Sequence, residues 1–120
     1  MNINVVVLSG RLTRDVDLRF SGSGVAIANI GICVNRRRKK GDDWVDEPVF
    51  VDVKMFGKRA EAFAKHHGKG DACCFPAGEL VYESWEKDGV ARNKLVVHAD
   101  SFEFVPRAAS AAPAEEDTPF

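Results

Sequence analysis

Residues 48–67 read PVFVDVKMFGKRAEAFAKHH, and the pattern of side chains changes at Gly57. Before this glycine, apolar side chains alternate with a mixed set, which is the period of a strand that has one face in a core. After it, apolar side chains recur every three or four residues, which is the period of a helix, and Gly68 is placed to end that helix. The stretch therefore predicts a strand over Pro48–Phe56 and a helix over Lys58–His67.

Most of the remaining sequence up to residue 105 is typical of β-structure, with β-branched and apolar runs separated by turn residues. We expect further strands over Val5–Leu12, Val16–Phe20, Val25–Val34, Ala72–Trp85 and Asn93–Val105. Pro76 predicts an edge or a bulge because proline cannot donate to the strand ladder, and Lys87-Asp88-Gly89 predicts the last turn. Five long strands with one short helix between the third and the fourth form an all-β chain. This is the layout of an OB-fold barrel, an architecture that binds oligonucleotides.

The chain divides into one domain and a tail. Its 120 residues are too few for two independent cores. From Ala108 an Ala-rich linker precedes an acidic end, which predicts a domain over residues 1–107 and a disordered tail over 108–120. All 17 Lys and Arg lie in the predicted domain, whereas the tail holds acids and no base, although the net charge is only −1. A basic body with an acidic tail indicates a nucleic-acid partner.

Several classes of function are disfavoured. The first ten residues have no basic start and no apolar run long enough for a signal peptide or a membrane span, so we expect a cytoplasmic, nucleoid-associated protein without membrane contact. Cys33, Cys73 and Cys74 form no Cys-x-x-Cys pair and the histidines are not spaced as zinc ligands, so we expect reduced core thiols and no metal. No nucleophile or carboxylate set has a catalytic context, so we expect neither an enzyme nor a cofactor.

One face of the predicted strand 48–56 suits a nucleic-acid strand. If its valine side faces the core, Phe50, Lys54 and Phe56 point outward together, so that rings can stack on bases while the ammonium meets phosphate. The alternative is that the helix or a second subunit buries this face. Trp85 has charged neighbours and is a third candidate for stacking. Trp44 is a fourth, although it fits equally well as a residue that packs in its loop.

A run of consecutive cations, Arg36 to Lys40, separates two predicted strands, and we expect a long charged hairpin loop over residues 36–43. Such a run is either a solvated loop or a flexible arm that closes over a phosphate backbone, and its place beside an aromatic face favours the arm. We predict phosphate contacts from Arg36, Arg37, Arg38, Lys39, Lys40, Lys54, Lys58 and Lys87.

Over nearly its whole length the sequence resembles the bacterial single-stranded DNA-binding protein family. The resemblance is carried, in order, by residues 6–15 (VVLSGRLTRD), 25–30 (VAIANI), 56–61 (FGKRAE), 69–71 (KGD) and 117–120 (DTPF). Each motif is weak alone, and their order and spacing are specific. The terminal Asp-Thr-Pro-Phe is similar to the acidic tip of the family and is the most diagnostic of the five.

The resemblance implies that Phe50, Phe56 and Trp85 stack on bases of single-stranded DNA and that the helix after Gly57 plugs the barrel. It also implies that the tip recruits DNA replication, recombination and repair proteins. The tip consists of Glu115, Glu116, Asp117, Thr118, Pro119 and Phe120. The chain departs from the family in four places: Arg38 stands where an aromatic residue is common, Phe50 stands where tryptophan is common, residues 73–77 are one longer than usual, and the linker is short.

Strands with apolar side chains on both faces predict a homo-oligomer, and the family resemblance makes it a tetramer. Val5–Leu8 and Val25–Val34 offer more apolar surface than one small barrel can bury. Three other functions compete with strand binding and protection: a primosomal-type OB-fold replication accessory protein, a small nuclease on an OB barrel, and a purely structural interaction module. The acidic tip argues against the first, and the absence of clustered carboxylates argues against the second.

Overall fold

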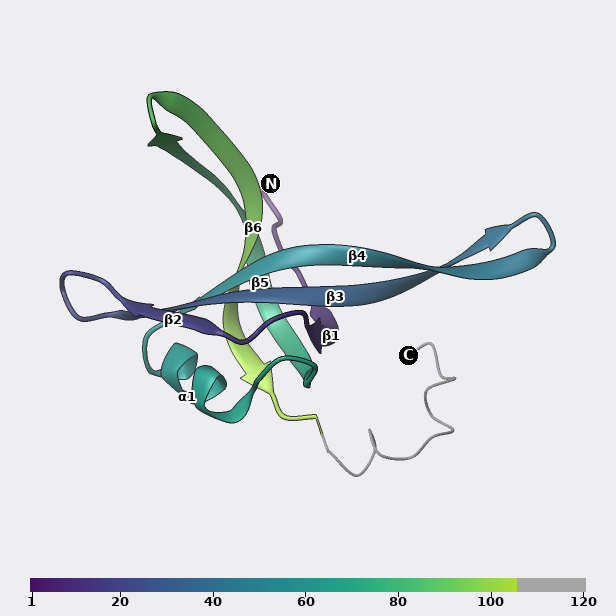
Figure 1. Ribbon diagram of the computed structural model, residues 1–120, viewed down its shortest axis with the longest axis horizontal. Helices are drawn as coiled ribbons and strands as arrows, with labels where there is room; N and C mark the ends of the chain where they lie inside the picture. The colour runs from purple at the N-terminus through teal and green to yellow at the C-terminus, as the bar shows by residue number, and fades with distance from the viewer. Residues whose placement is uncertain (106–120) are drawn as a thin grey trace.

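The computed structural model describes residues 1–105. Its elements, shown in Figure 1, are β1 (Leu8–Leu12), β2 (Asp17–Phe20), β3 (Ala26–Lys40), β4 (Asp43–Phe56), α1 (Lys58–His66), β5 (Ala72–Lys87) and β6 (Val90–Glu103). The strands follow the order β1-β5-β6-β4-β3-β2, and β1 also pairs with β3, which closes the sheet into a barrel. Because β1 and β2 pair with successive parts of β3, they act as one interrupted strand. The predicted five-stranded OB-fold barrel with α1 between its third and fourth strands is confirmed.

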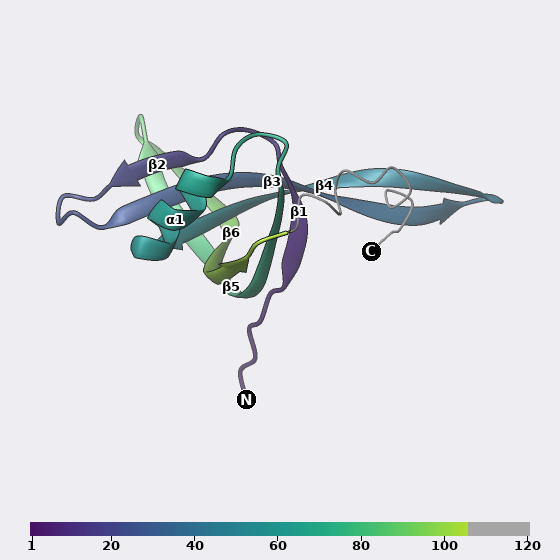
Figure 2. The ribbon, with the colours of Figure 1, turned by 90° about the horizontal axis from the view of Figure 1, so that it is seen from below.

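The barrel core is built from alternate residues of the long strands. On β3 the buried side chains are Ala26, Ala28, Ile30 and Ile32, and on β4 they are Val53 and Met55. The predicted helix adds Phe63, which is fully buried and whose ring centroid lies 5.3 Å from that of Phe75 and 5.2 Å from that of Phe102. Burying one such side chain contributes about 3 kcal/mol. The helix therefore plugs one end of the barrel, as Figures 1 and 2 show.

The helix begins and ends for different reasons. Gly57 adopts a φ of 81°, a conformation that favours glycine, and this turns the chain directly from β4 into α1. At the other end the helix stops at His66 because His67 is extended, with φ −130°. The prediction that Gly68 ends the helix is therefore wrong by one residue.

The predicted charged loop over residues 36–43 is wrong, since these residues form the end of a long hairpin. β3 runs to Lys40, β4 begins at Asp43, and Gly41 takes φ 65° in the turn between them. Cross-strand partners explain the extension, because Arg36 lies opposite Glu47 and other opposite charges also face one another. The hairpin projects well beyond the barrel, and we call it the β3–β4 arm (Figure 1).

Two other local predictions are confirmed. Asp88 and Gly89, both with positive φ, make the two-residue turn between β5 and β6. The register of β5 against β6 shifts on both sides of Ala77, so Pro76 lies in a bulge. The strand predicted from Val5 begins at Leu8, and residues 1–7 lead away from it (Figure 2).

Candidate nucleic-acid interface

The outward face of β4 carries the aromatic residues that the alternation predicts. Phe50 is 70% exposed and Phe56 is 44% exposed, while Val53 and Met55 on the other face lie in the core. The valine face is buried only within the barrel. Val49, which lies toward the arm end of β4, is exposed. On β5, Trp85 is 41% exposed. The three aromatic side chains are thus available to a ligand, and their role in stacking stays a prediction.

Salt bridges join the outward face of β4 to the β5–β6 hairpin. The ammonium of Lys54 lies 2.9 Å from Oε1 of Glu83, and Nε2 of His98 lies 3.0 Å from Oε2 of the same carboxylate. The ring of Phe56 meets that of His98 edge-on, with centroids 5.1 Å apart. Trp85 follows Glu83 by two residues, so both side chains lie on one side of β5. The three predicted aromatic residues therefore belong to one surface, which we call the aromatic face.

A second carboxylate, Asp52, lies on the aromatic face between Phe50 and Lys54. It pairs with Lys94 of β6 at 3.4 Å and with Arg14 at 3.8 Å. Arg14 comes from the turn between β1 and β2 and reaches Asp52 across β3 at Gly31, where an added Cβ would collide with the guanidinium. The ammonium of Lys94 also lies 5.8 Å from the centre of the Trp85 ring, which suits a cation–π contact.

The ionisation of Glu83 reflects these neighbours. Burial alone would raise the pKa of this carboxyl, but hydrogen bonds from His98 and Lys54 outweigh burial, so the pKa lies below its usual value. Glu83 is therefore a carboxylate at neutral pH. Consequently the predicted phosphate ligand Lys54 already has an anionic partner in the free protein.

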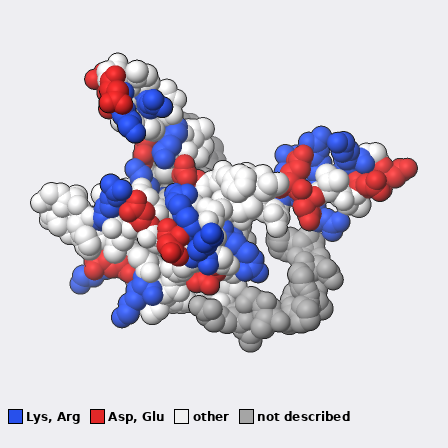
Figure 3. Space-filling view, in the orientation of Figure 1, with Lys and Arg blue, Asp and Glu red and all other residues white. Residues whose placement is uncertain are grey.

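The five consecutive cations of the arm do not lie on one surface, because strand geometry sends them to two faces. Arg37 and Lys39 lie opposite Asp46 and Trp44, on the same side of the β3–β4 ladder as Phe50. The other three cations, Arg36, Arg38 and Lys40, point to the opposite side. Figure 3 shows Lys and Arg beside Asp and Glu along both projecting hairpins.

Several arm cations already have partners. Nη1 of Arg38 lies 2.9 Å from Glu47, and Nε of Arg37 lies 3.8 Å from Asp46. The guanidinium of Arg37 also lies 5.6 Å from the centre of the exposed Trp44 ring. Trp44 lies on the same side of the β3–β4 ladder as Phe50, opposite Lys39 near the end of the arm, and its role in stacking stays a prediction.

The remaining predicted site residues lie at the edges or outside the described chain. Lys58 is exposed as the first residue of α1, and Lys87 is exposed as the last residue of β5, on the Trp85 side. The tip, Glu115–Phe120, lies outside the described residues, so the prediction for it is not addressed by the fold.

Known proteins resemble this chain in both sequence and fold. The sequence matches the single-strand binding protein family over residues 3–105. The chain belongs to that family. Single-stranded DNA-binding proteins of Treponema pallidum and Wolinella succinogenes are 36% and 46% identical to it over 119 and 104 residues, which are 99% and 85% of this chain and 67% and 64% of theirs.

A solved family structure agrees with the fold. The wild-type single-stranded DNA-binding protein from Thermus aquaticus superimposes with a TM-score of 0.72 at 27% identity. The match covers 84% of this chain and 49% of that one, and a deletion mutant of the same protein gives a TM-score of 0.79 at 26% identity. This family member thus spans about half of the Thermus aquaticus chain and about two thirds of the relatives named above.

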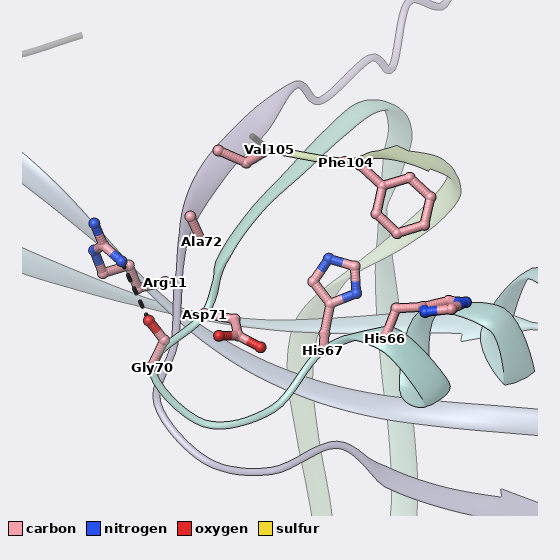
Figure 4. A pocket seen from close by; sticks show the side chains of 8 residues that line it. All are labelled: Arg11, His66, His67, Gly70, Asp71, Ala72, Phe104 and Val105. Atoms are coloured by element: carbon pink, nitrogen blue, oxygen red, sulfur yellow. Dashed lines mark hydrogen bonds between the residues drawn. The ribbon is translucent and has the colours of Figure 1, made fainter. Parts of the chain in front are cut away.

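A hollow of about 100 Å³ lies apart from the aromatic face, between the end of α1 and the segment after β6 (Figure 4). His67 stacks on Phe63 with centroids 4.0 Å apart and faces Phe104 at 5.8 Å. Nη1 of Arg11 donates to the carbonyl of Gly70 at 3.2 Å. Of the predicted site residues that the structure describes, none lines this hollow. Within residues 1–105 there is no group of three or more potential metal ligands, and α1 is too short to cross a membrane.

The alternation along residues 49–56 already puts Asp52 on the outward face, but sequence reasoning missed four other polar residues of the aromatic face: Arg14, Glu83, Lys94 and His98. Lys94 could have been found, because the Asp88-Gly89 turn sets the register that places it opposite Glu83. Arg14 carried no local signal, since its position depends on the closure of the barrel.

Proposed function

We propose that this chain binds single-stranded DNA without sequence preference, on the aromatic face. The observation that carries the proposal is the presence of Phe50, Phe56 and Trp85, all exposed, on one surface that is crossed by cations. Every base has a π-face, so rings alone give sequence-tolerant contacts of about 1–3 kcal/mol per stacked base. Cations beside the rings, Lys54 and Lys94 among them, suit the phosphates between those bases.

Titration of the protein with poly-deoxythymidine, followed by tryptophan fluorescence, tests this function. We expect tight binding with quenched emission, because Trp85 stacks on a base. Affinity should fall with salt by roughly 0.7 log units per neutralised phosphate for each log unit of salt. A protein that bound duplex and single strands equally well, or whose Trp85→Ala variant kept both affinity and quenching, would contradict the proposed face.

We propose that the chain forms a homo-oligomer, specifically a tetramer. Such an assembly would bury apolar surface that a single barrel leaves exposed. The exposed apolar side chains outside the aromatic face include Ile3, Val5, Val7, Leu80, Tyr82 and Leu95. Asn4 holds the N-terminal segment of Ile3, Val5 and Val7 against β5, because its amide exchanges two hydrogen bonds of 2.8 Å with the backbone of Leu80. Together these apolar side chains form an exposed patch of the kind that marks an interface. Light scattering at micromolar concentration should give about four times the 13.2 kDa chain mass, and a monomeric mass would refute the proposal.

The acidic tip, in our proposal, docks proteins of DNA replication, recombination and repair in the cytoplasm. Its sequence supports this: Phe120 offers an aromatic ring, Pro119 limits the backbone freedom lost on binding, and three acids precede them. We also propose that the DNA-binding domain ends near residue 107 and that the tip lies beyond it. Deleting Asp117–Phe120 should abolish pull-down of such partners and leave strand affinity intact or slightly raised at low salt. Retained pull-down would place recruitment on the barrel.

A further inference from the structure

Two carboxylates lie within a surface that we expect to meet a polyanion. Asp52 and Glu83 are both on the aromatic face, between the rings that are available for stacking. A phosphate near either of them is repelled, and at an interface such like-charge contacts oppose binding. Carboxylates at these positions lower the affinity for a polyanion, so we expect a role that offsets this loss of affinity.

Each carboxylate is held between two basic side chains from other strands or turns. Asp52 has Lys94 and Arg14 within 4 Å, and Glu83 has Lys54 and His98 at about 3 Å. The two groups differ in exposure. The Lys54 and Glu83 side chains are 26% and 20% exposed, whereas Arg14 and Asp52 are 53% and 46% exposed.

We propose that Asp52 and Glu83 act as exchangeable counter-charges of the aromatic face, an inference that rests on the proposed function. In the free protein they hold Lys94, Arg14 and Lys54 over the face. When a strand binds, its phosphates take over Lys94 and Arg14 and share Lys54 with Glu83, and the carboxylates remain as a repulsive charge. They thereby lower the affinity for DNA and reduce its salt dependence.

The geometry assigns the two carboxylates different shares of this effect. The pairs of Asp52 are long and exposed, and exposed pairs of this kind are weak, so Lys94 and Arg14 are readily transferred to phosphate. The pairs of Glu83 are short and half-buried, so Lys54 stays close to it and phosphate must share that cation. Asp52 therefore mainly governs how many cations reach the strand, and Glu83 mainly adds repulsion.

This arrangement favours release of the strand. Cations that regain a carboxylate when the DNA leaves do not have to be resolvated as free charges. Among variants of one interface most affinity differences arise in the dissociation rate, so the carboxylates should shorten the lifetime of the complex. A protein that must give up its strand to other proteins benefits from such a lifetime.

Substitutions that remove only the negative charge test the proposal. Asp52→Asn and Glu83→Gln keep the size of each side chain, and Glu61→Gln, exposed on α1, removes the same charge away from the aromatic face as a matched control. Binding of a deoxythymidine oligonucleotide is titrated at several salt concentrations, with dissociation measured by stopped flow. Thermal melting confirms that each variant is folded, and Asp52→Glu, which restores the charge, should restore wild-type binding.

We expect Asp52→Asn to bind about two- to fivefold more tightly than wild type at 0.1 M salt, through slower dissociation. Its salt dependence should steepen by up to roughly 0.7 per additional phosphate contacted. Glu83→Gln should also bind more tightly, and Glu61→Gln should match wild type. The inference is overturned if both face variants bind as Glu61→Gln does, or more weakly, while wild-type binding is normal. Absence of binding by the wild-type protein would instead overturn the proposed function, and this inference with it.

Discussion

Truncation of Phe50 separates strand binding from folding more cleanly than any other change on the aromatic face. The side chain is 70% exposed, so Phe50→Ala removes little buried surface and should lower the free energy of unfolding by less than about 1 kcal/mol. The same change removes one stacking ring, which is worth about 1–3 kcal/mol per base, or roughly a 5- to 150-fold loss of affinity. Phe56→Ala is less clean, because that ring also packs on His98.

Phe20→Ala is a matched control for Phe50→Ala. Phe20 is 60% exposed and lies on β2 opposite the buried Ala26, so its side chain is on the other side of the sheet from Phe56. Affinity for poly-deoxythymidine is measured by fluorescence titration, and stability by chemical denaturation. The control should bind like wild type.

If Phe50→Ala remained folded and bound within twofold of wild type, this ring would have no part in stacking. Should Phe20→Ala lose as much affinity as Phe50→Ala, the loss would instead reflect general damage to the barrel. If Phe50→Ala lost stability as well as affinity while Phe20→Ala lost neither, the Phe50 ring would contribute to the fold and not to DNA binding.

Four further outcomes follow from the described residues. Arg37→Ala, on the side of the aromatic face, should flatten the salt dependence of binding, whereas Arg36→Ala, on the opposite side of the arm, should leave it nearly unchanged; equal slopes would contradict the division of the arm. Burial raises the pKa of the Cys73 thiol to about 11, so this cysteine should be alkylated far more slowly than Cys33 or Cys74 at pH 8, as mass spectrometry of modified peptides would show. The lowered pKa of Glu83 stabilises the fold above the ordinary value of 4.5, and this contribution should disappear as the pH falls through the folded pKa; melting curves of wild type and Glu83→Gln should therefore converge in acid. Phe63→Ala should cost about 3–5 kcal/mol in a denaturant titration, because it empties the barrel plug.

Local signals in the sequence determined the strands of the barrel, its helix and its aromatic residues. Alternation along residues 49–56 separated Val53 and Met55 from Phe50 and Phe56, because side chains on a strand point to opposite faces whatever lies beyond them. Helical spacing located α1, and turn chemistry located Asp88-Gly89, since both depend on neighbours in the chain. The order of such motifs also led to the family.

Only the tertiary structure decided which charges share the aromatic face and what shape the arm takes. Lys54 and Glu83 are 29 residues apart, and Lys94 and Asp52 are 42 apart, so no local pattern connects them. The run of cations at residues 36–40 predicted a loop, but in the folded chain its backbone pairs with β4, and acids lie across from Arg36 and Arg37. Side-chain periodicity follows from the local backbone conformation, so it can be recognised in the sequence alone. Pairing between charges is set by strand register and barrel closure, which exist only after distant segments have met.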